Sequence, residues 1–191
     1  MTKLPIVRVS SSIGIFYDFQ MTHPFDYSKS LQQLECEVWD ERDATTRLVQ
    51  RVLLLRKLPI EDFSLGDLRC LILQQISLEI LLPRAFPILE INPLIESEYY
   101  PGDLLMSVLA LGLGHPQLAR HKERTLQIAL NAFSNLKAER LLEFERLFRG
   151  LAPEEFGLTP EAYEKSKRAA MTEIEKSMIG KELISFIERL A

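Results

Sequence analysis

Residues 96–105 read Glu-Ser-Glu-Tyr-Tyr-Pro-Gly-Asp-Leu-Leu and specify local structure more strongly than any other stretch of the chain. The Pro101-Gly102 pair predicts a turn, because proline fixes φ and glycine tolerates positive φ. Asp103 follows at a position where a carboxylate can accept hydrogen bonds from the unpaired backbone N–H groups of a helix N-terminus. We therefore predict a turn and then a helix that begins at Asp103. Its predicted buried face consists of Leu104, Leu105, Val108 and Leu109.

The segment that leads into this turn is acidic and aromatic. Between Glu90 and Asp103 the sequence has no Lys, Arg or His that could balance the carboxylates. Uncompensated acids beside tyrosines suit contact with a basic partner. The candidate contact residues are Glu90, Glu96, Glu98, Tyr99, Tyr100 and Asp103. The alternatives are a solvated acidic loop in which Asp103 only caps a helix, and ordinary packing roles for the tyrosines.

Capping residues and hydrophobic periodicity predict several helices before this stretch. They are a short helix after Ser28 or Ser30 that carries Leu31 and Leu34, a helix over residues 44–57 capped by Asp43, a helix from the Ser64-Asp67 capping box to about Ile76, and a buried helix over residues 78–89. Pro83 and Pro87 predict a kink or a break in the last of these. Trp39 is expected in the core, as large aromatic residues usually are.

The two ends of the chain have different patterns. Residues 4–19 alternate in polarity in a way that favours a small β-hairpin. The glycines and proline between Gly112 and Pro116 mark a boundary, and beyond it apolar residues at helical spacing predict one long helix or two divided near Ser134. Thr159-Pro160 predicts the start of a charged helix that runs to about Ile179, where Gly180 interrupts it before a short final helix.

Together these elements predict an all-α protein. We expect a compact helical domain over residues 28–115, a helical C-terminal extension over residues 116–191 packed on it, and an N-terminal segment, residues 1–27, that holds at most a small β-hairpin. The chain has 191 residues and a formal net charge of −4, so a strong global field for nucleic acid is absent. Residues 1–19 do not resemble a secretory signal, and Cys36 and Cys70 are expected to be reduced thiols in the cytoplasm.

The sequence gives no support for catalysis, a metal or a cofactor. His23, His115 and His121 are scattered, no Cys-x-x-Cys or phosphate-binding loop is present, and the acids between Glu90 and Asp103 do not have the spacing of a calcium loop. One alternative function is a nucleic-acid-associated regulator that uses the basic side of the 44–57 helix, formed by Arg47, Arg51, Arg56 and Lys57. Another is oligomerisation through the helices after residue 116.

Several short motifs occur in an order that is typical of one protein family. They are Ser30-Leu-Gln-Gln-Leu34, Trp39, Gln74-Gln75 within an apolar helix, Leu81-Leu82-Pro83, Asn92-Pro93 and Tyr100-Pro-Gly-Asp-Leu-Leu105. Over about residues 28–112 the chain resembles the immunity proteins of bacterial contact-dependent growth inhibition systems. The chain departs from the family pattern at Leu73, Ser77 and Ser97, where we expect glycines.

The resemblance implies a small, cytoplasmic, largely helical protein that is not an enzyme. Members of the family bind the C-terminal toxin domain of a cognate exported effector and neutralise it. We therefore expect the partner to be such a toxin domain, basic in character, with a nuclease as one candidate, and we expect no membrane and no direct nucleic-acid partner. An acidic loop would speed encounter with a basic toxin, and an interface of about 1,600 Å² would suffice to occlude an active site.

Overall fold

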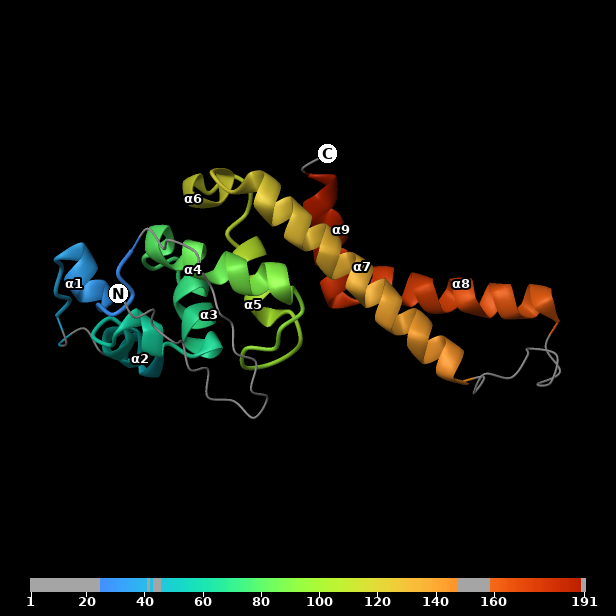
Figure 1. Cartoon of the computed structure of the whole chain (residues 1–191), viewed down its shortest axis with the longest axis horizontal. Coiled ribbons are helices and arrows are strands. Elements are labelled where there is room, and N and C mark those ends of the chain that lie inside the picture. The colour runs from blue at the N-terminus through green and yellow to red at the C-terminus, as the bar shows by residue number, and fades with distance from the viewer. Residues whose placement is uncertain (1–24, 41, 43–45, 148–158, 190–191) are drawn as a thin grey trace, which may run out of the picture.

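The computed structural model of the chain describes residues 25–40, 42, 46–147 and 159–189. The fold is all-α, as predicted, and the described residues form no sheet, only isolated bridges between Ser30 and Pro59 and between Glu96 and Pro101. Figure 1 shows a compact group of short helices joined to an arm of longer ones. The hairpin predicted over residues 4–19 lies outside the described residues.

The compact group contains α1 (Leu31–Glu35), α2 (Arg47–Leu55), the 3₁₀ helix η2 (Ile60–Asp62), α3 (Leu65–Leu73), α4 (Leu78–Ile91), α5 (Asp103–Leu109) and α6 (Pro116–Ala119). The arm consists of α7 (Lys122–Leu147) and α8 (Pro160–Lys176), and α9 (Met178–Glu188) returns from the arm to the compact group. The segment after residue 120 therefore forms one long helix, not two divided near Ser134.

Side-chain caps start three helices where the sequence predicts them. Ser30 caps α1 in a capping box with Gln33, and Ser64 caps α3 in a capping box with Asp67. The Oγ1 atom of Thr159 accepts a hydrogen bond from the backbone N–H of Ala162 at 3.2 Å and starts α8. Each cap satisfies backbone donors that the helix itself leaves unpaired. These bonds span only three residues, which is why the sequence alone reveals them.

Helix α2 begins later than predicted. Thr46 caps it, with its Oγ1 accepting from the backbone N–H of Val49 at 3.2 Å. The proposed cap, Asp43, lies outside the described residues. Trp39 is not in the core as expected: it is 37% exposed and stacks on the guanidinium of Arg56 at 4.0 Å from the ring centroid.

Helix α4 is continuous through both of its prolines, so the predicted break does not occur. Pro83 and Pro87 each lack the N–H that would pair with the carbonyl four residues earlier, which belongs to Glu79 and to Pro83 respectively. Glu79 is exposed and Pro83 is half-buried, so water can reach that side of the helix. Burial holds the helix together, because four large, fully buried side chains each contribute roughly 1.5–3 kcal/mol, against about 3 kcal/mol for an interior proline. The four are Leu81, Leu82, Phe86 and Leu89.

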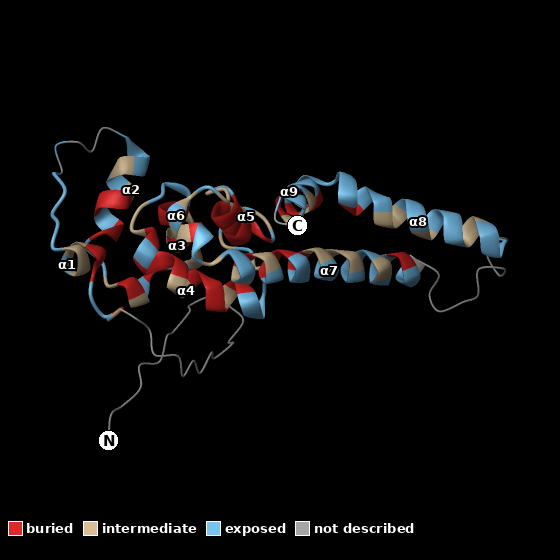
Figure 2. Ribbon diagram, turned by 90° about the horizontal axis from the view of Figure 1, so that it is seen from above, coloured by how far each residue is buried: buried red, intermediate tan, exposed pale blue. Residues whose placement is uncertain are grey.

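A single hydrophobic core extends from α1 to α9. Helices α3, α4 and α5 supply its centre, including the predicted face of α5, and Figure 2 shows α5 as almost wholly buried. The first half of α7 and α9 pack into the same core through Ile128, Ala129, Leu183 and Phe186. The division of the chain into segments at residues 27 and 115 remains a prediction. None of the described helices has the length and apolar character needed to cross a membrane.

The arm is more exposed than the compact group (Figure 2). Its two helices are tied together by the Lys137–Glu175 ion pair at 3.4 Å and by the Phe144 and Tyr163 rings, whose centroids are 5.4 Å apart. Leu130, one of the apolar residues at helical spacing, is 39% exposed, because the buried face of α7 passes through Thr125, Ile128, Ala129 and Ala132.

The break between the last two helices occurs at Ser177, not at Gly180 as predicted. The Oγ atom of Ser177 donates to the carbonyl of Ile174 and accepts from the backbone N–H of Gly180 at 3.0 Å, so it ends α8 and starts α9. Gly180 lies inside α9, where a Cβ atom would stand 1.9 Å from the Ile174 carbonyl oxygen. The glycine therefore permits a close approach of two backbones and does not interrupt a helix.

Candidate functional site at the α4–α5 loop

Asp103 organises the loop that precedes α5. Its Oδ1 atom accepts from the backbone N–H of Ser97 at 2.8 Å and from the Ser97 hydroxyl at 2.6 Å. Its Oδ2 atom accepts from the backbone N–H groups of Glu98 and Tyr99, both at 3.0 Å. The helix does begin at Asp103, but its N-cap is Gly102 at φ 85°. The alternative that Asp103 only caps a helix is therefore wrong, because its carboxylate folds the loop.

The Asp103 carboxylate stays ionised in this setting. It is only 1% exposed, and burial alone would raise its pKa. The hydrogen bonds from the Ser97 side chain and from the backbone of Tyr99, Ser97 and Glu98 outweigh burial, so the pKa lies below the ordinary value. A charged acceptor makes stronger hydrogen bonds than a neutral one, which favours a fixed loop conformation.

A network of charged side chains connects this loop to α2 and α3. Arg69 of α3 places its Nε atom 3.4 Å from Asp103 and its Nη1 atom 3.7 Å from Glu98. Arg51 of α2 contacts Glu98 at 3.1 Å and Asp67 at 3.0 Å. The loop is thus held by two guanidinium groups that come from 34 and 52 residues earlier in the sequence, counted from Asp103.

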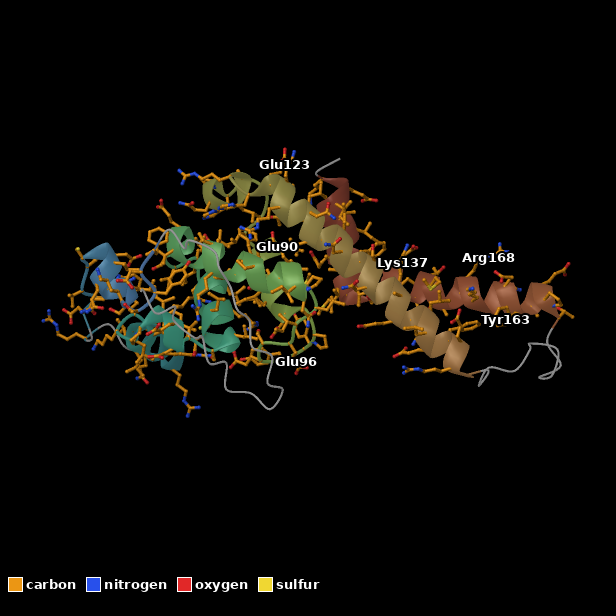
Figure 3. The ribbon with its side chains drawn as sticks, viewed as in Figure 1. Glu90, Glu96, Glu123, Lys137, Tyr163 and Arg168 are labelled. Carbon is orange, nitrogen blue, oxygen red and sulfur yellow. The ribbon has the colours of Figure 1, made fainter. Side chains whose placement is uncertain are left out.

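The network corrects the expectation that the acids of this segment have no basic counterpart. Glu98 and Asp103 face Arg51 and Arg69, and Glu90 on α4 accepts from Arg124 Nη2 at 2.8 Å. Figure 3 shows Glu90 beside the start of α7 and away from Glu96, which lies on the loop. Among the described residues, the Glu96 carboxylate has no ion pair or side-chain hydrogen bond, and it is exposed.

Tyr99 is the exposed aromatic residue of the loop. Its ring lies 4.5 Å from the Arg69 guanidinium carbon, and 62% of the residue is exposed. Its backbone N–H donates to Asp103, and its ring packs on Arg69, so both the backbone and the ring are fixed in place while much of the ring remains exposed. Tyr100 is half-buried. Of the six predicted contact residues, the structure brings Glu96, Glu98, Tyr99, Tyr100 and Asp103 together and places Glu90 elsewhere.

From the sequence, neither Arg51 nor Arg69 was assigned to this site. Arg69 stands in the otherwise apolar run Leu68–Ile72, and a lone cation in a buried helix requires an internal partner. That pattern could have identified it as part of a site. Arg51 was assigned to a basic face of the 44–57 helix, but its guanidinium group forms ion pairs with Asp67 and Glu98 of the same chain.

The basic face of α2 does not form. Arg56 is 2% exposed, pairs with Glu35 at 2.7 Å and donates to the carbonyl of Glu37 at 3.3 Å. With Arg51 also engaged, only Arg47 and Lys57 of the four cations are exposed. This removes the observation on which the nucleic-acid alternative depended.

Two of the departures from the expected glycine pattern have structural uses. The Ser97 hydroxyl donates to Asp103, as described above. The Ser77 hydroxyl donates to Glu35 Oε1 at 2.6 Å, although Ser77 has a φ of 51°, which favours glycine. The hydrogen bond from Ser77 offsets the strain of its positive φ, and the one from Ser97 adds to the contacts that fold the loop.

A groove adjoins the loop between α3, α5 and the start of α9. It has a volume of about 400 Å³ and is lined in part by Arg69, Tyr100 and Asp103. The described residues contain no group of three or more His, Cys, Asp or Glu that could hold a metal ion. Cys36 and Cys70 are unpaired, the first exposed and the second buried.

Comparison with known proteins gives one match. The family model of the CDI immunity proteins, those of contact-dependent growth inhibition, matches residues 33–128, which is just over half of the chain. No curated protein and no solved structure matches. The matched residues contain α2 to α6, the complete loop and both arginines that hold it. The chain therefore belongs to the CDI immunity protein family.

Proposed function

We propose that this protein binds the C-terminal toxin domain of a cognate contact-dependent growth inhibition effector and neutralises it by stoichiometric occlusion, in the cytoplasm and without chemistry of its own. The observation that carries the proposal is the combination of membership of the family with an exposed tyrosine on a fixed loop. Tyr99 stacks on Arg69 and is held at its backbone by Asp103, yet most of its surface is open.

The physical argument is preorganisation. A loop that is already fixed loses little conformational entropy on binding, so more of the contact energy contributes to affinity. Tyrosine is among the residues that most often dominate binding energy at protein interfaces. Glu98 and Asp103 support the loop through internal ion pairs in this proposal, and Tyr99 makes the contact, with Tyr100 beside it.

The proposed partner is a basic toxin domain, such as a nuclease, whose active site must hold phosphates. Glu96 supports this choice because its carboxylate is exposed and has no partner among the described residues. An exposed charge of this kind mainly affects the rate of association, and salt weakens its effect. Glu90 is engaged by Arg124 and contributes less to this field.

The test is a binding measurement with the purified C-terminal domain of the exported effector encoded directly upstream. We expect a one-to-one complex, and we expect Tyr99→Ala to weaken it at least tenfold, whereas Tyr99→Phe keeps the ring and most of the affinity. Glu96→Lys should slow association at low salt, while the matched variant Glu139→Lys, at an exposed position on α7, should not. If the wild-type protein does not bind that domain or does not inhibit it, the proposed function is wrong.

A further inference from the structure

The groove beside the loop is built partly from the C-terminal segment of the chain. Arg69 and Leu73 of α3 form one wall, Met106 of α5 contributes to the floor, and Met178 and Glu182 of α9 form the other wall. In Figures 1 and 2, α5 lies between α3 and α9, so the three helices bring together residues more than 100 positions apart in the sequence. Residues 178 and 182 lie outside the segment that the family model matches.

Each wall of the groove contains an exposed apolar side chain beside a charged one. Leu73 is 42% exposed and Met178 is 61% exposed. The volume of about 400 Å³ lies within the range of about 300–1,000 Å³ typical of ligand-binding pockets. Methionine side chains are flexible and polarizable, so Met106 and Met178 can adapt to an inserted side chain.

The charges around the groove favour a basic occupant. On the floor, Asp103 is balanced by Arg69 at 3.4 Å, so that pair leaves little net field. At the opposite wall Glu182 is exposed, and its carboxylate has no ion pair or side-chain hydrogen bond with any described residue. Glu96, on the loop that leads to Tyr100, is likewise exposed, and its carboxylate has no ion pair with any described residue. The groove thus combines exposed apolar side chains with one unpaired carboxylate in its lining, Glu182, and the adjoining loop carries a second, Glu96.

We propose that this groove receives a segment of the toxin domain that inserts an apolar side chain and places lysine or arginine residues beside it, toward Glu182 and Glu96. This rests on the proposed function and adds to it a second contact surface, continuous with Tyr99 through Arg69. It also assigns a role to α9: the C-terminal segment completes the binding site that the family-matched helices begin. Partner specificity then depends on residues of both segments.

The principal test is Leu73→Arg in the full-length protein, measured against the purified toxin domain. Leu73 is the last residue of α3, where a cation interacts favourably with the helix dipole, so folding should be preserved. An arginine in the slot blocks the apolar insertion and repels a basic segment, and we expect at least a tenfold loss of affinity, mainly through faster dissociation. Leu142→Arg is the matched control, because Leu142 is also an exposed leucine (54%, against 42% for Leu73) and lies on α7, and the affinity of this variant should equal that of wild type.

Two further variants test α9 itself. Met178→Ala shortens the wall without adding charge and should weaken binding several-fold. Glu182→Lys should reduce the association rate at low salt, with the difference from wild type shrinking as salt is added. Glu139→Lys makes the same charge change on α7 and should leave the rate unchanged.

The outcomes separate the two proposals. If the wild-type protein fails to bind the toxin domain, the proposed function is wrong. If wild type binds and Tyr99→Ala weakens the complex, but Leu73→Arg, Met178→Ala and Glu182→Lys all bind like wild type, the groove proposal alone is wrong. The groove proposal is also wrong if Leu73→Arg lowers the melting temperature of the free protein by more than Leu142→Arg does, because the groove is then covered by the chain itself. It is wrong, too, if the wild-type protein is a dimer on gel filtration and Leu73→Arg makes it a monomer, because the occupant of the groove is then a second copy.

Discussion

Replacing Asp103 with asparagine tests whether this carboxylate holds the loop. The change keeps the shape of the side chain and removes its charge. In the native loop each carboxylate oxygen accepts two hydrogen bonds, Oδ1 from Ser97 and Oδ2 from Glu98 and Tyr99. An asparagine amide offers one oxygen and one NH₂ group, so in either orientation the NH₂ group faces at least one backbone N–H donor.

The expected cost follows from these contacts. Two hydrogen bonds to a charged acceptor are lost, and each is worth roughly 1.5–3 kcal/mol. Water can bind to the freed N–H groups of the exposed residues Glu98 and Tyr99, and this regains part of the lost free energy. Arg69 also loses its buried counter-ion at 3.4 Å but keeps a weaker contact with Glu98. We expect a net loss of about 3 kcal/mol in the free energy of unfolding, which for a chain of this size corresponds to a fall in melting temperature of roughly 6–12 °C.

The assay is urea unfolding followed by circular dichroism, with thermal unfolding alongside it. With a denaturant slope of about 2 kcal/mol/M, the midpoint should fall by roughly 1.5 M. Glu139→Gln, which neutralises an exposed acid on α7, serves as the control and should unfold like wild type. An Asp103→Asn midpoint equal to that of wild type would refute the claim that this carboxylate organises the loop.

The effect of Asp103 should also depend on pH. Its folded-state pKa lies below the ordinary value of 3.8, so the stabilisation is fully present above that value and is lost as the pH falls through the folded-state pKa. The difference in unfolding free energy between wild type and Asp103→Asn should therefore stay constant from pH 7 to pH 5 and shrink below about pH 4. A difference that grows in acid would contradict the assigned direction.

Three other changes probe the rest of the fold. Arg56→Met leaves Glu35 without its buried partner and should cost about 3–5 kcal/mol, and the double change with Glu35→Met should recover much of that, as measured by urea unfolding. Gly180→Ala brings a Cβ to 1.9 Å from the Ile174 carbonyl oxygen and should destabilise the α8–α9 junction by about 1–3 kcal/mol. Gly114→Ala is its counterpart, since a Cβ there meets nothing within 4 Å, and its melting temperature should be unchanged or slightly higher.

The sequence predicts those parts of the fold that depend on neighbours. The caps at Ser30, Ser64 and Thr159 use hydrogen bonds to residues three positions away, and the predicted starts of those helices are correct. The buried face of α5 is also correct, because a repeat of apolar residues at helical spacing marks one side of a helix. The break that was one of two alternatives for α4 is absent, and the interruption predicted at Gly180 occurs at Ser177. Both expectations relied on the local preferences of proline and glycine, whereas burial and a backbone contact decide these positions.

The local structure of the loop could be predicted from the sequence, but its internal contacts could not, and its role in binding stays a prediction. The loop was identified because Tyr100–Leu105 has a strong turn-and-helix pattern, yet its charge balance depends on Arg51, 47 residues before Glu98, and on Arg69, 34 residues before Asp103. No local pattern shows which distant cation meets which acid. Counting charges along a segment therefore overestimated how acidic the surface is.

This correction changes how the loop can serve recognition. If all its acids were exposed, any change of partner would require changes throughout the segment. Instead, Glu98 and Asp103 are committed to the frame with Arg51 and Arg69, whereas Glu96 and most of Tyr99 face outward. A substitution at Glu96 should change stability little, because exposed side chains away from caps and networks usually change it by less than about 0.5 kcal/mol. Loss of the Tyr99 ring also removes its contact with Arg69, which at an exposed site is worth about 0.5–1 kcal/mol. Under the proposed function, the frame would allow Glu96 and Tyr99 to vary with the toxin while the loop keeps its shape.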